Sequence, residues 1–418
     1  MAATPVEAEP GVVRDARAEW RSGWPIAFAA AGGIFTAVLY VYSTGLFLEP
    51  LANFGWSRVD ITSGMLIVGV VAAFGNPFIG LLVDRVGPGR ISAFGVIAYA
   101  IAMAALGLTG PNADGWRLGW VAVAFASLAI SVPVWLVAVA RHFDKARGMA
   151  LAIGYCGSSI AALSVPWITQ QLIEHLGWRA AYAGIGLLAL TIGGAASLTL
   201  LRAGGSRFEA RPAAGLVFSG SSLRVSLGST RFWRIALMSL IVTIGVIGLT
   251  VHFVPICVEH GIWRETGASL AGLIGIAGLA GRLGTGWLLD RLPGTLIGAV
   301  LFSIPALACL LLWQGAPGMF GMAMVAIAVG VSLGAELDIM AYLTTRYFGL
   351  GNYGFLFGIL TGIVGCAAGF GPLLASALRD RGGDYAVFAQ TLFWGFLLSV
   401  LIVATLGRYD RGDPLSRV

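Results

Sequence analysis

The chain has 418 residues, of which 58% are hydrophobic and 11% are charged, and its formal net charge is +6. Because soluble domains carry about 25% charged residues, this composition excludes a water-soluble protein and indicates that lipid surrounds most of the chain. The basic residues are spread over short gaps between apolar runs. This argues against nucleic acid as a partner, since nucleic-acid binders gather such residues on one face.

Apolar runs of about 20 residues, long enough to cross a bilayer core of about 30 Å as a helix, follow one another along the chain. Twelve runs lie at about residues 24–47, 61–83, 91–110, 117–141, 148–173, 179–202, 233–257, 266–289, 295–314, 318–345, 353–378 and 385–407. We therefore predict an all-α integral membrane protein with twelve transmembrane helices.

The longest polar stretch lies near the middle of the chain and is too short to bury a core of its own. It separates two six-helix halves. The predicted segments are a cytoplasmic N-terminal tail (1–23), an N-terminal half (24–202), a cytoplasmic linker (203–232), a C-terminal half (233–407) and a cytoplasmic C-terminal tail (408–418).

The distribution of Lys and Arg predicts the orientation. Of these 26 residues, nineteen lie in segments on the side of both termini, six lie in the opposite loops, and Arg282 lies inside an apolar run. Positive residues accumulate on the cytoplasmic side of membrane proteins, so both termini are predicted to be cytoplasmic. We expect a multi-pass protein of a bacterial inner membrane, functional as a monomer in lipid.

The two halves repeat each other at an offset of about 206 residues. Three matches occur in the same order: Gly80-Leu-Leu-Val-Asp84-Arg85 with Gly286-Trp-Leu-Leu-Asp290-Arg291, Pro166 with Pro372, and Arg141-His-Phe143 with Arg346-Tyr-Phe348 at an offset of 205. Coincidence among apolar segments does not readily explain matches that include charged residues, so a duplicated six-helix unit is indicated.

The segment Gly80-x-Leu-x-Asp84-Arg85-x-Gly87-x-x-Arg90 resembles the loop motif between helices 2 and 3 of the major facilitator superfamily. Its chemistry suggests a latch, because a carboxylate and an arginine at a tight turn can hold neighbouring helix ends together. Gly89 departs from the motif, since the family often has a second basic residue there. The residues predicted to form this conformational latch are Asp84, Arg85, Arg90, Asp290, Arg291 and Asp338.

Shorter motifs are similar to those of one branch of this superfamily, the monocarboxylate and oxalate:formate transporters. They are Phe54-Gly-Trp-Ser-Arg58, Arg141-His-Phe-Asp-Lys-Ala-Arg147-Gly148, Gly177-Trp-Arg179, His252-Phe-Val-Pro255 and Gly281-Arg282-Leu-Gly284. The resemblance implies two halves that hold a substrate between them near the midplane.

Arg282 is the sharpest candidate for substrate binding. It precedes Asp290 by eight residues, about 12 Å along a helix, and a charge at that depth normally faces a cavity or a partner. Its guanidinium is a natural fork for a carboxylate, and the resemblance implies the same role. The alternative is a structural ion pair. The family often has an acidic residue one turn earlier, where this chain has Gly278.

Glu336 and Asp338 are two acids in apolar surroundings. They are two residues apart, about 200° around a helix, so both cannot face one cavity. We predict that the deeper Glu336 is the partner of Arg282 and the proton site, and that Asp338 holds helix ends together. A structural role for Glu336 remains open. His252 is a second candidate for proton transfer, or else lines a gate.

Four further residues are weaker candidates for substrate binding. Asn76 is the repeat mate of Arg282, because 282 minus 206 is 76, and it places an amide on the facing half. Tyr40, Trp135 and Tyr155 could line the cavity, although aromatic residues in such helices more often pack.

These features predict a secondary transporter that moves a small organic monocarboxylate with a proton. Anion exchange, efflux of an amphiphilic compound, and, least favoured, a membrane sensor remain as alternatives. No Gly-rich Lys-Ser/Thr nucleotide motif occurs, and no nucleophile–base pair or metal cluster has a plausible spacing. We therefore expect no enzyme activity, no cofactor and no metal.

Overall fold

The computed structural model describes residues 15–56, 58–110, 113–207, 222–315 and 318–407. In order, its helices are α1 (Ala16–Ala37), α2 (Leu39–Ser43), a 3-10 turn (Thr44–Phe47), α3 (Leu48–Asn53), α4 (Arg58–Val86), α5 (Pro88–Leu106), α6 (Ala113–Leu128), α7 (Val132–His142), α8 (Arg147–Arg207), α9 (Leu223–Gly228), α10 (Thr230–Glu259), α11 (Arg264–Leu289), α12 (Gly294–Trp313), α13 (Gly318–Phe348), α14 (Tyr353–Gly382) and α15 (Ala386–Ala404).

The described helices account for all twelve predicted spans. In the described part of the chain, ten helical stretches are long and apolar enough to cross a membrane, and α1 joined to the bent segment Leu39–Phe47 makes an eleventh. The twelfth comes from α8, whose apolar stretch Arg147–Ala203 has 57 residues, about 86 Å of helix. It breaks at Gly177, where φ is 75°, a conformation that glycine adopts without strain.

The fourth predicted span is divided into α6 and α7 by a turn before Pro133. Proline has no N–H and cannot continue the ladder of backbone hydrogen bonds. The indole Nε1 of Trp135 donates to the carbonyl of Ile130 at 2.8 Å, satisfying an oxygen at the turn. In lipid such a bond matters, because no water is present to replace it.

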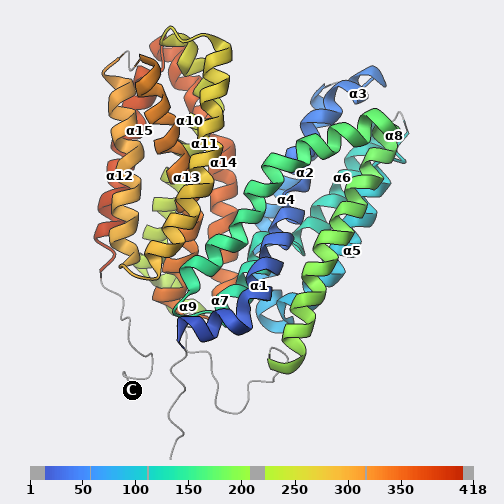
Figure 1. Ribbon diagram of the computed structural model, residues 1–418. Coiled ribbons are helices and arrows are strands. Elements are labelled where there is room, and N and C mark those ends of the chain that lie inside the picture. Colours follow the sequence, from blue (N-terminus) through green and yellow to red (C-terminus); the bar gives the residue numbers. More distant parts are fainter. Residues whose placement is uncertain (1–14, 57, 111–112, 208–221, 316–317, 408–418) are drawn as a thin grey trace, which may run out of the picture.

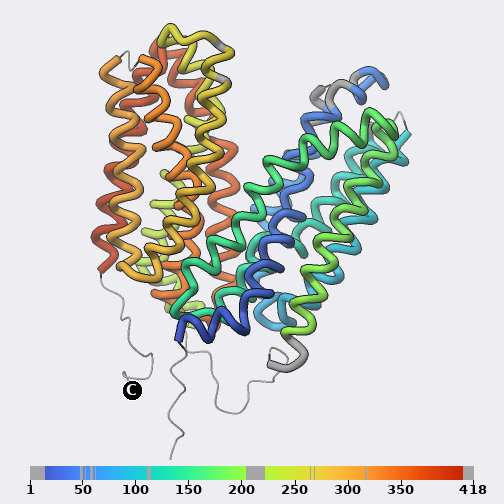
Figure 2. The backbone as a smooth tube through the Cα atoms, in the orientation of Figure 1, coloured from blue at the N-terminus to red at the C-terminus, as the bar shows by residue number. Residues whose placement is uncertain are grey.

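The helices form two bundles, one containing α1 to α8 and the other α10 to α15 (Figure 1). The bundles meet at the end where α1 begins and α15 ends, and they diverge towards the opposite end (Figure 2). We call the first end the terminal side. The largest contacts between the bundles are those of α4 with α14 and α8 with α11.

Helix α1 begins at Ala16, inside the segment 1–23 that is predicted as the N-terminal tail. Glu19 fixes this part of α1 to the first bundle. It is 2% exposed, and its carboxylate accepts hydrogen bonds from the backbone N–H groups of residues 144–146 at 3.0 to 3.2 Å. The first turns of α1 are therefore tied to the loop before α8. Residues 1–14, the linker segment 208–221 and the tail 408–418 lie outside the described residues.

Candidate functional site

Two aspartates, each at the end of a helix in one bundle, bind the beginning of a helix in the other. The Asp84 carboxylate accepts hydrogen bonds from the N–H groups of Gly354 (3.2 Å) and Phe355 (3.1 Å). Asp290 does the same with Gly148 (2.6 Å) and Met149 (3.1 Å). The donors differ by 206 residues (354 minus 148, 355 minus 149), as the aspartates do (290 minus 84). Each carboxylate satisfies N–H groups that a helix leaves unpaired at its start and complements the helix dipole.

Glycines allow the backbones to come together at these two contacts. A Cβ added to Gly80 would lie 2.0 Å from the carbonyl oxygen of Gly354, and one added to Gly148 would lie 2.6 Å from that of Gly286. These two pairs are also related by 206 residues. Only residues without a side chain permit such an approach, so the terminal side is closed by backbone contact.

The arginine that pairs with Asp84 is Arg141. Its Nη2 donates to Asp84 Oδ1 at 2.8 Å, and both side chains are at most 10% exposed. The predicted latch residues Arg85, in the last turn of α4, and Arg90, in the first turn of α5, are exposed. The sequence shows Arg141 as part of the repeated Arg-x-Phe match, but the spacing of residues along the chain does not indicate that Arg141 pairs with Asp84.

On the second contact, Arg291 lies over the Trp287 ring at 4.0 Å and acts electrostatically on Asp290. Burial raises the pKa of the Asp290 carboxyl to about 6, and its two backbone N–H donors, Arg346 and Arg291 oppose that shift. The carboxylate is therefore mostly ionised at neutral pH, the form that accepts both hydrogen bonds. A further ion pair joins the bundles, because Arg346 Nη1 donates to Asp144 Oδ1 at 2.9 Å.

Arg282 lies in α11 in a buried polar cluster between the bundles. Arg282 is 6% exposed, and its Nη1 lies 3.9 Å from Asp338 Oδ1 on α13. Its guanidinium carbon lies 4.9 Å from the ring centroid of Tyr155 on α8, a cation–π distance. Within the described residues, Arg282 Nε and Nη1, both Asp338 carboxylate oxygens and the Tyr155 hydroxyl have no hydrogen-bond partner. Buried polar atoms are normally hydrogen-bonded, so this cluster has unused capacity to bind a polar ligand.

The prediction that Glu336 pairs with Arg282 is wrong in this conformation. The ion-pair partner is Asp338, and Glu336 Oε1 is instead in hydrogen-bond contact with the Thr243 hydroxyl of α10. The reason is the rotation of α13 against its neighbours. Gly334, one helical turn before Asp338, lies against the backbone of Gly278 and Arg282 in α11, so Asp338 is on the face that meets α11, while Glu336, about 200° away around the helix, faces α10.

Asp338 therefore does not hold helix ends together as predicted, because it lies deep in α13 and is 0% exposed. Thr243 escaped the sequence analysis. A hydroxyl in an apolar run commonly bonds to the carbonyl four residues earlier, and so it carries no special signal until a neighbouring helix is placed.

The structure places the other candidates in different surroundings. Asn76 lies where α4 meets α14, its backbone against Gly358, and its buried Oδ1 has no hydrogen-bond partner in the described residues. Tyr40 packs edge-on against Trp120 at 6.4 Å. Trp135 is fully buried with its ring against Gly33 of α1, so the prediction that it lines the cavity is wrong. Its indole N–H instead donates to the Ile130 carbonyl at the turn before Pro133.

His252 lies far from this cluster. It is nine residues beyond Thr243 in α10, about 14 Å further from the terminal side. One ring nitrogen contacts the Tyr385 hydroxyl at 2.8 Å, and the other contacts the Pro372 carbonyl at 3.2 Å. These contacts join α10 to α14 and to the start of α15.

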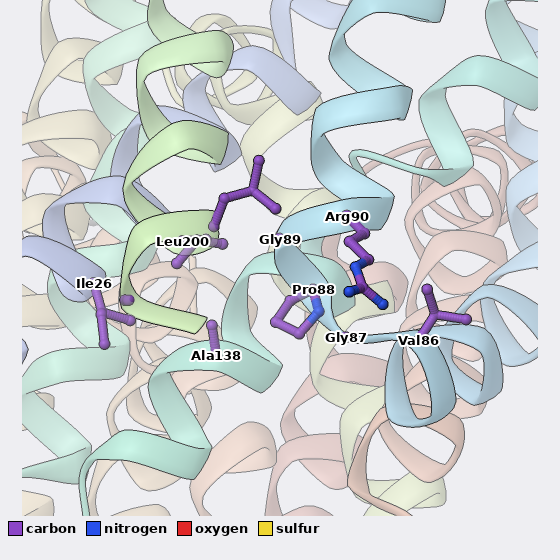
Figure 3. Close-up of a pocket in the computed structure, with 10 residues that line it drawn as sticks. Ile26, Val86, Gly87, Pro88, Gly89, Arg90, Ala138 and Leu200 are labelled. Carbon is purple, nitrogen blue, oxygen red and sulfur yellow. The ribbon is translucent and has the colours of Figure 1, made fainter. Parts of the chain in front are cut away.

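A separate crevice lies within the first bundle, on the terminal side. It is formed by the turn from α4 to α5, by α7 and by the end of α8 (Figure 3). Apart from Arg90, its lining is apolar or glycine, including Ile26, Ala138 and Leu200. It lacks the converging polar groups that fix a small ligand, so we place the candidate site at Arg282.

Sequence comparison identifies the family. A model of the Major Facilitator Superfamily matches residues 26–349, more than half of the chain. The chain belongs to the Major Facilitator Superfamily. Members of this superfamily are transporters and not enzymes.

Curated relatives and solved structures agree with this membership. The chain is 23% identical to monocarboxylate transporter 13 of Bos taurus over 371 residues, covering 83% of this chain and 79% of that protein. It is 24% identical to a gallate transporter of Pseudomonas putida over 303 residues, covering 60% and 66%. The fold resembles that of the superfamily transporter FucP in the outward conformation, with a TM-score of 0.68, 17% identity, and 92% and 99% of the two chains covered.

Proposed function

We propose that this superfamily transporter is a secondary active transporter that moves a small organic monocarboxylate, together with a proton, across a bacterial inner membrane. The observation that carries the proposal is the buried Arg282, which has unused donors between the two bundles. A guanidinium offers two parallel N–H groups to a carboxylate. Relatives named as monocarboxylate and gallate transporters support the substrate class.

Alternating access requires the two halves to move relative to each other, and we propose that the contacts of Asp84 with α14 and of Asp290 with α8 break and re-form during that movement. We propose that the halves 24–202 and 233–407 rock about the Arg282 cluster, and that the linker 203–232 connects them. Asp84 and Asp290 would release their helix ends when the terminal side opens. Because those carboxylates bind backbone N–H groups, the closed arrangement is held by contacts that do not involve substrate.

The experiment that tests the function is uptake into proteoliposomes. A panel of labelled acetate, lactate, benzoate and gallate would be offered with and without an imposed pH gradient. Proton symport predicts accumulation in the direction of the proton flow, about tenfold per pH unit for one proton per substrate. Uptake that requires an internal anion and ignores the pH gradient would instead establish exchange, and no uptake of any carboxylate would refute the proposal.

The orientation gives a separate prediction. From the distribution of nineteen basic residues on one side and six on the other, a tag at either terminus should remain inaccessible to a membrane-impermeant label in intact cells and become reactive after permeabilisation. The terminal side would then be cytoplasmic, and the conformation described here would be open to the outside. Labelling of the C-terminal tag in intact cells would reverse this assignment.

A further inference from the structure

Asp338 already occupies the position that a substrate carboxylate would take at Arg282. It is the acid nearest the guanidinium, is 0% exposed, and belongs to the same half of the molecule as Arg282. Gly281 of α11 lies against the backbone of Val331, and Gly334 of α13 lies against the carbonyl of Gly278. Close packing of these two helices therefore brings the carboxylate and the guanidinium together.

The contact between them is loose. At 3.9 Å, the nearest nitrogen and oxygen are about 1 Å further apart than in a charge-assisted hydrogen bond, which spans about 2.7–2.9 Å. Neither Asp338 oxygen has a hydrogen-bond partner in the described residues. A free carboxylate that offers two oxygens at bonding distance would therefore bind Arg282 better than Asp338 does.

Glu336 is held in a different way. The Thr243 hydroxyl lies 2.8 Å from the Ser239 carbonyl and also contacts Glu336 Oε1. Glu336 therefore has a side-chain partner on α10, whereas neither carboxylate oxygen of Asp338 has a hydrogen-bond partner in the described residues and its ion-pair contact is Arg282. Asp338, and not Glu336, is the carboxylate that a substrate would displace at Arg282.

We propose that Asp338 is an internal ligand of Arg282, that the substrate carboxylate displaces it, and that the displaced Asp338 takes up the co-transported proton. The inference rests on the proposed function. A buried carboxylate that loses its cation is costly unless it is neutralised, so substrate binding favours protonation and protonation favours substrate binding. The proton enters from solvent with the substrate, and it leaves when Asp338 pairs with Arg282 again.

The surroundings of the pair contain few other charges. Arg282 comes from α11, and the ionisable groups near the pair are Tyr42 from α2, Tyr155 and Cys156 from α8, Tyr353 from α14 and Glu336 from α13 itself. On α10, Thr243 is in hydrogen-bond contact with Glu336 and with the Ser239 carbonyl, and neither Thr243 nor Ser239 is ionisable. The described part of α12 contains Cys309 as its ionisable side chain. In these surroundings, Asp338 is the carboxylate that is paired with Arg282 while the site is empty.

Asp338→Asn and Glu336→Gln form a matched pair of variants for the test, because each replaces a carboxyl by an amide of equal size on the same helix. Both would be reconstituted with a labelled carboxylate that the unmodified protein transports. We expect Asp338→Asn to retain counterflow exchange within a few-fold and to lose accumulation driven by a pH gradient. Glu336→Gln should retain both. The proposal would be overturned if Asp338→Asn accumulated the carboxylate at the level of the unmodified protein. It would also be overturned if Glu336→Gln, and not Asp338→Asn, lost accumulation driven by a pH gradient.

Thermal denaturation in detergent gives a second readout that does not depend on transport. Asp338→Ala leaves Arg282 without its carboxylate, so the melting temperature should fall, and acetate should restore more of it than chloride at equal concentration. The restoration should be smaller in the unmodified protein and in Glu336→Ala. If acetate and chloride act alike on Asp338→Ala, the internal-ligand assignment is refuted. If acetate restores stability but no carboxylate is transported by the unmodified protein, the proposed function fails while the Arg282–Asp338 contact stands.

Discussion

Arg282→Lys is expected to insert and fold normally and to transport carboxylates far more slowly than the unmodified protein. Lysine keeps the positive charge that balances the buried Asp338, so the fold should tolerate the change. It loses the planar fork that binds two carboxylate oxygens at once. A hydrogen bond to a charged group contributes about 1.5–3 kcal/mol, so losing one should weaken binding by roughly 10- to 150-fold.

The measurement is carboxylate uptake in proteoliposomes that contain equal amounts of variant and unmodified protein. Arg291→Lys is the matched control. Arg291 lies near the end of the same helix, over the Trp287 ring and donating to its carbonyl, and should tolerate lysine with little change in uptake. Normal uptake by Arg282→Lys would exclude bidentate binding at this residue and leave Arg282 as a structural partner of Asp338.

Gly80→Leu is expected to prevent closure of the terminal side and to stop transport altogether. A Cβ at this position would meet the Gly354 carbonyl oxygen at 2.0 Å, and backbone atoms cannot move aside as a flexible side chain can. The bundles would have to separate at α4 and α14, which would also pull Gly354 and Phe355 away from Asp84. The variant should therefore remain folded, with the terminal side open.

Distance measurements between spin labels on α4 and α14 at the terminal side would detect this separation. Gly69→Leu is the control, because Gly69 lies in the same helix and has no atom within 4 Å of an added Cβ. It should leave both the distance and the transport unchanged. An unaltered distance in Gly80→Leu would mean that the glycine contact does not close this side.

The sequence by itself determined the elements that form within one segment. In lipid every backbone group must find its partner locally, so each transmembrane helix is an apolar run, and all twelve could be located by composition. The repeat of 206 residues was equally visible, and it predicted that Asp84 and Asp290 occupy equivalent positions. Arg282 stood out because a charge in such a run is costly and therefore unusual.

Only the tertiary structure decided which side chains face one another. Whether Glu336 or Asp338 meets Arg282 depends on how α13 is rotated against α11 and α10, and that rotation is not written in the residues around Asp338. The same holds for Arg141 at Asp84 and for Trp135 at the turn before Pro133. These contacts depend on the rotation and the offset between neighbouring helices, because a helix fixes its own backbone hydrogen bonds but not the position of its neighbour.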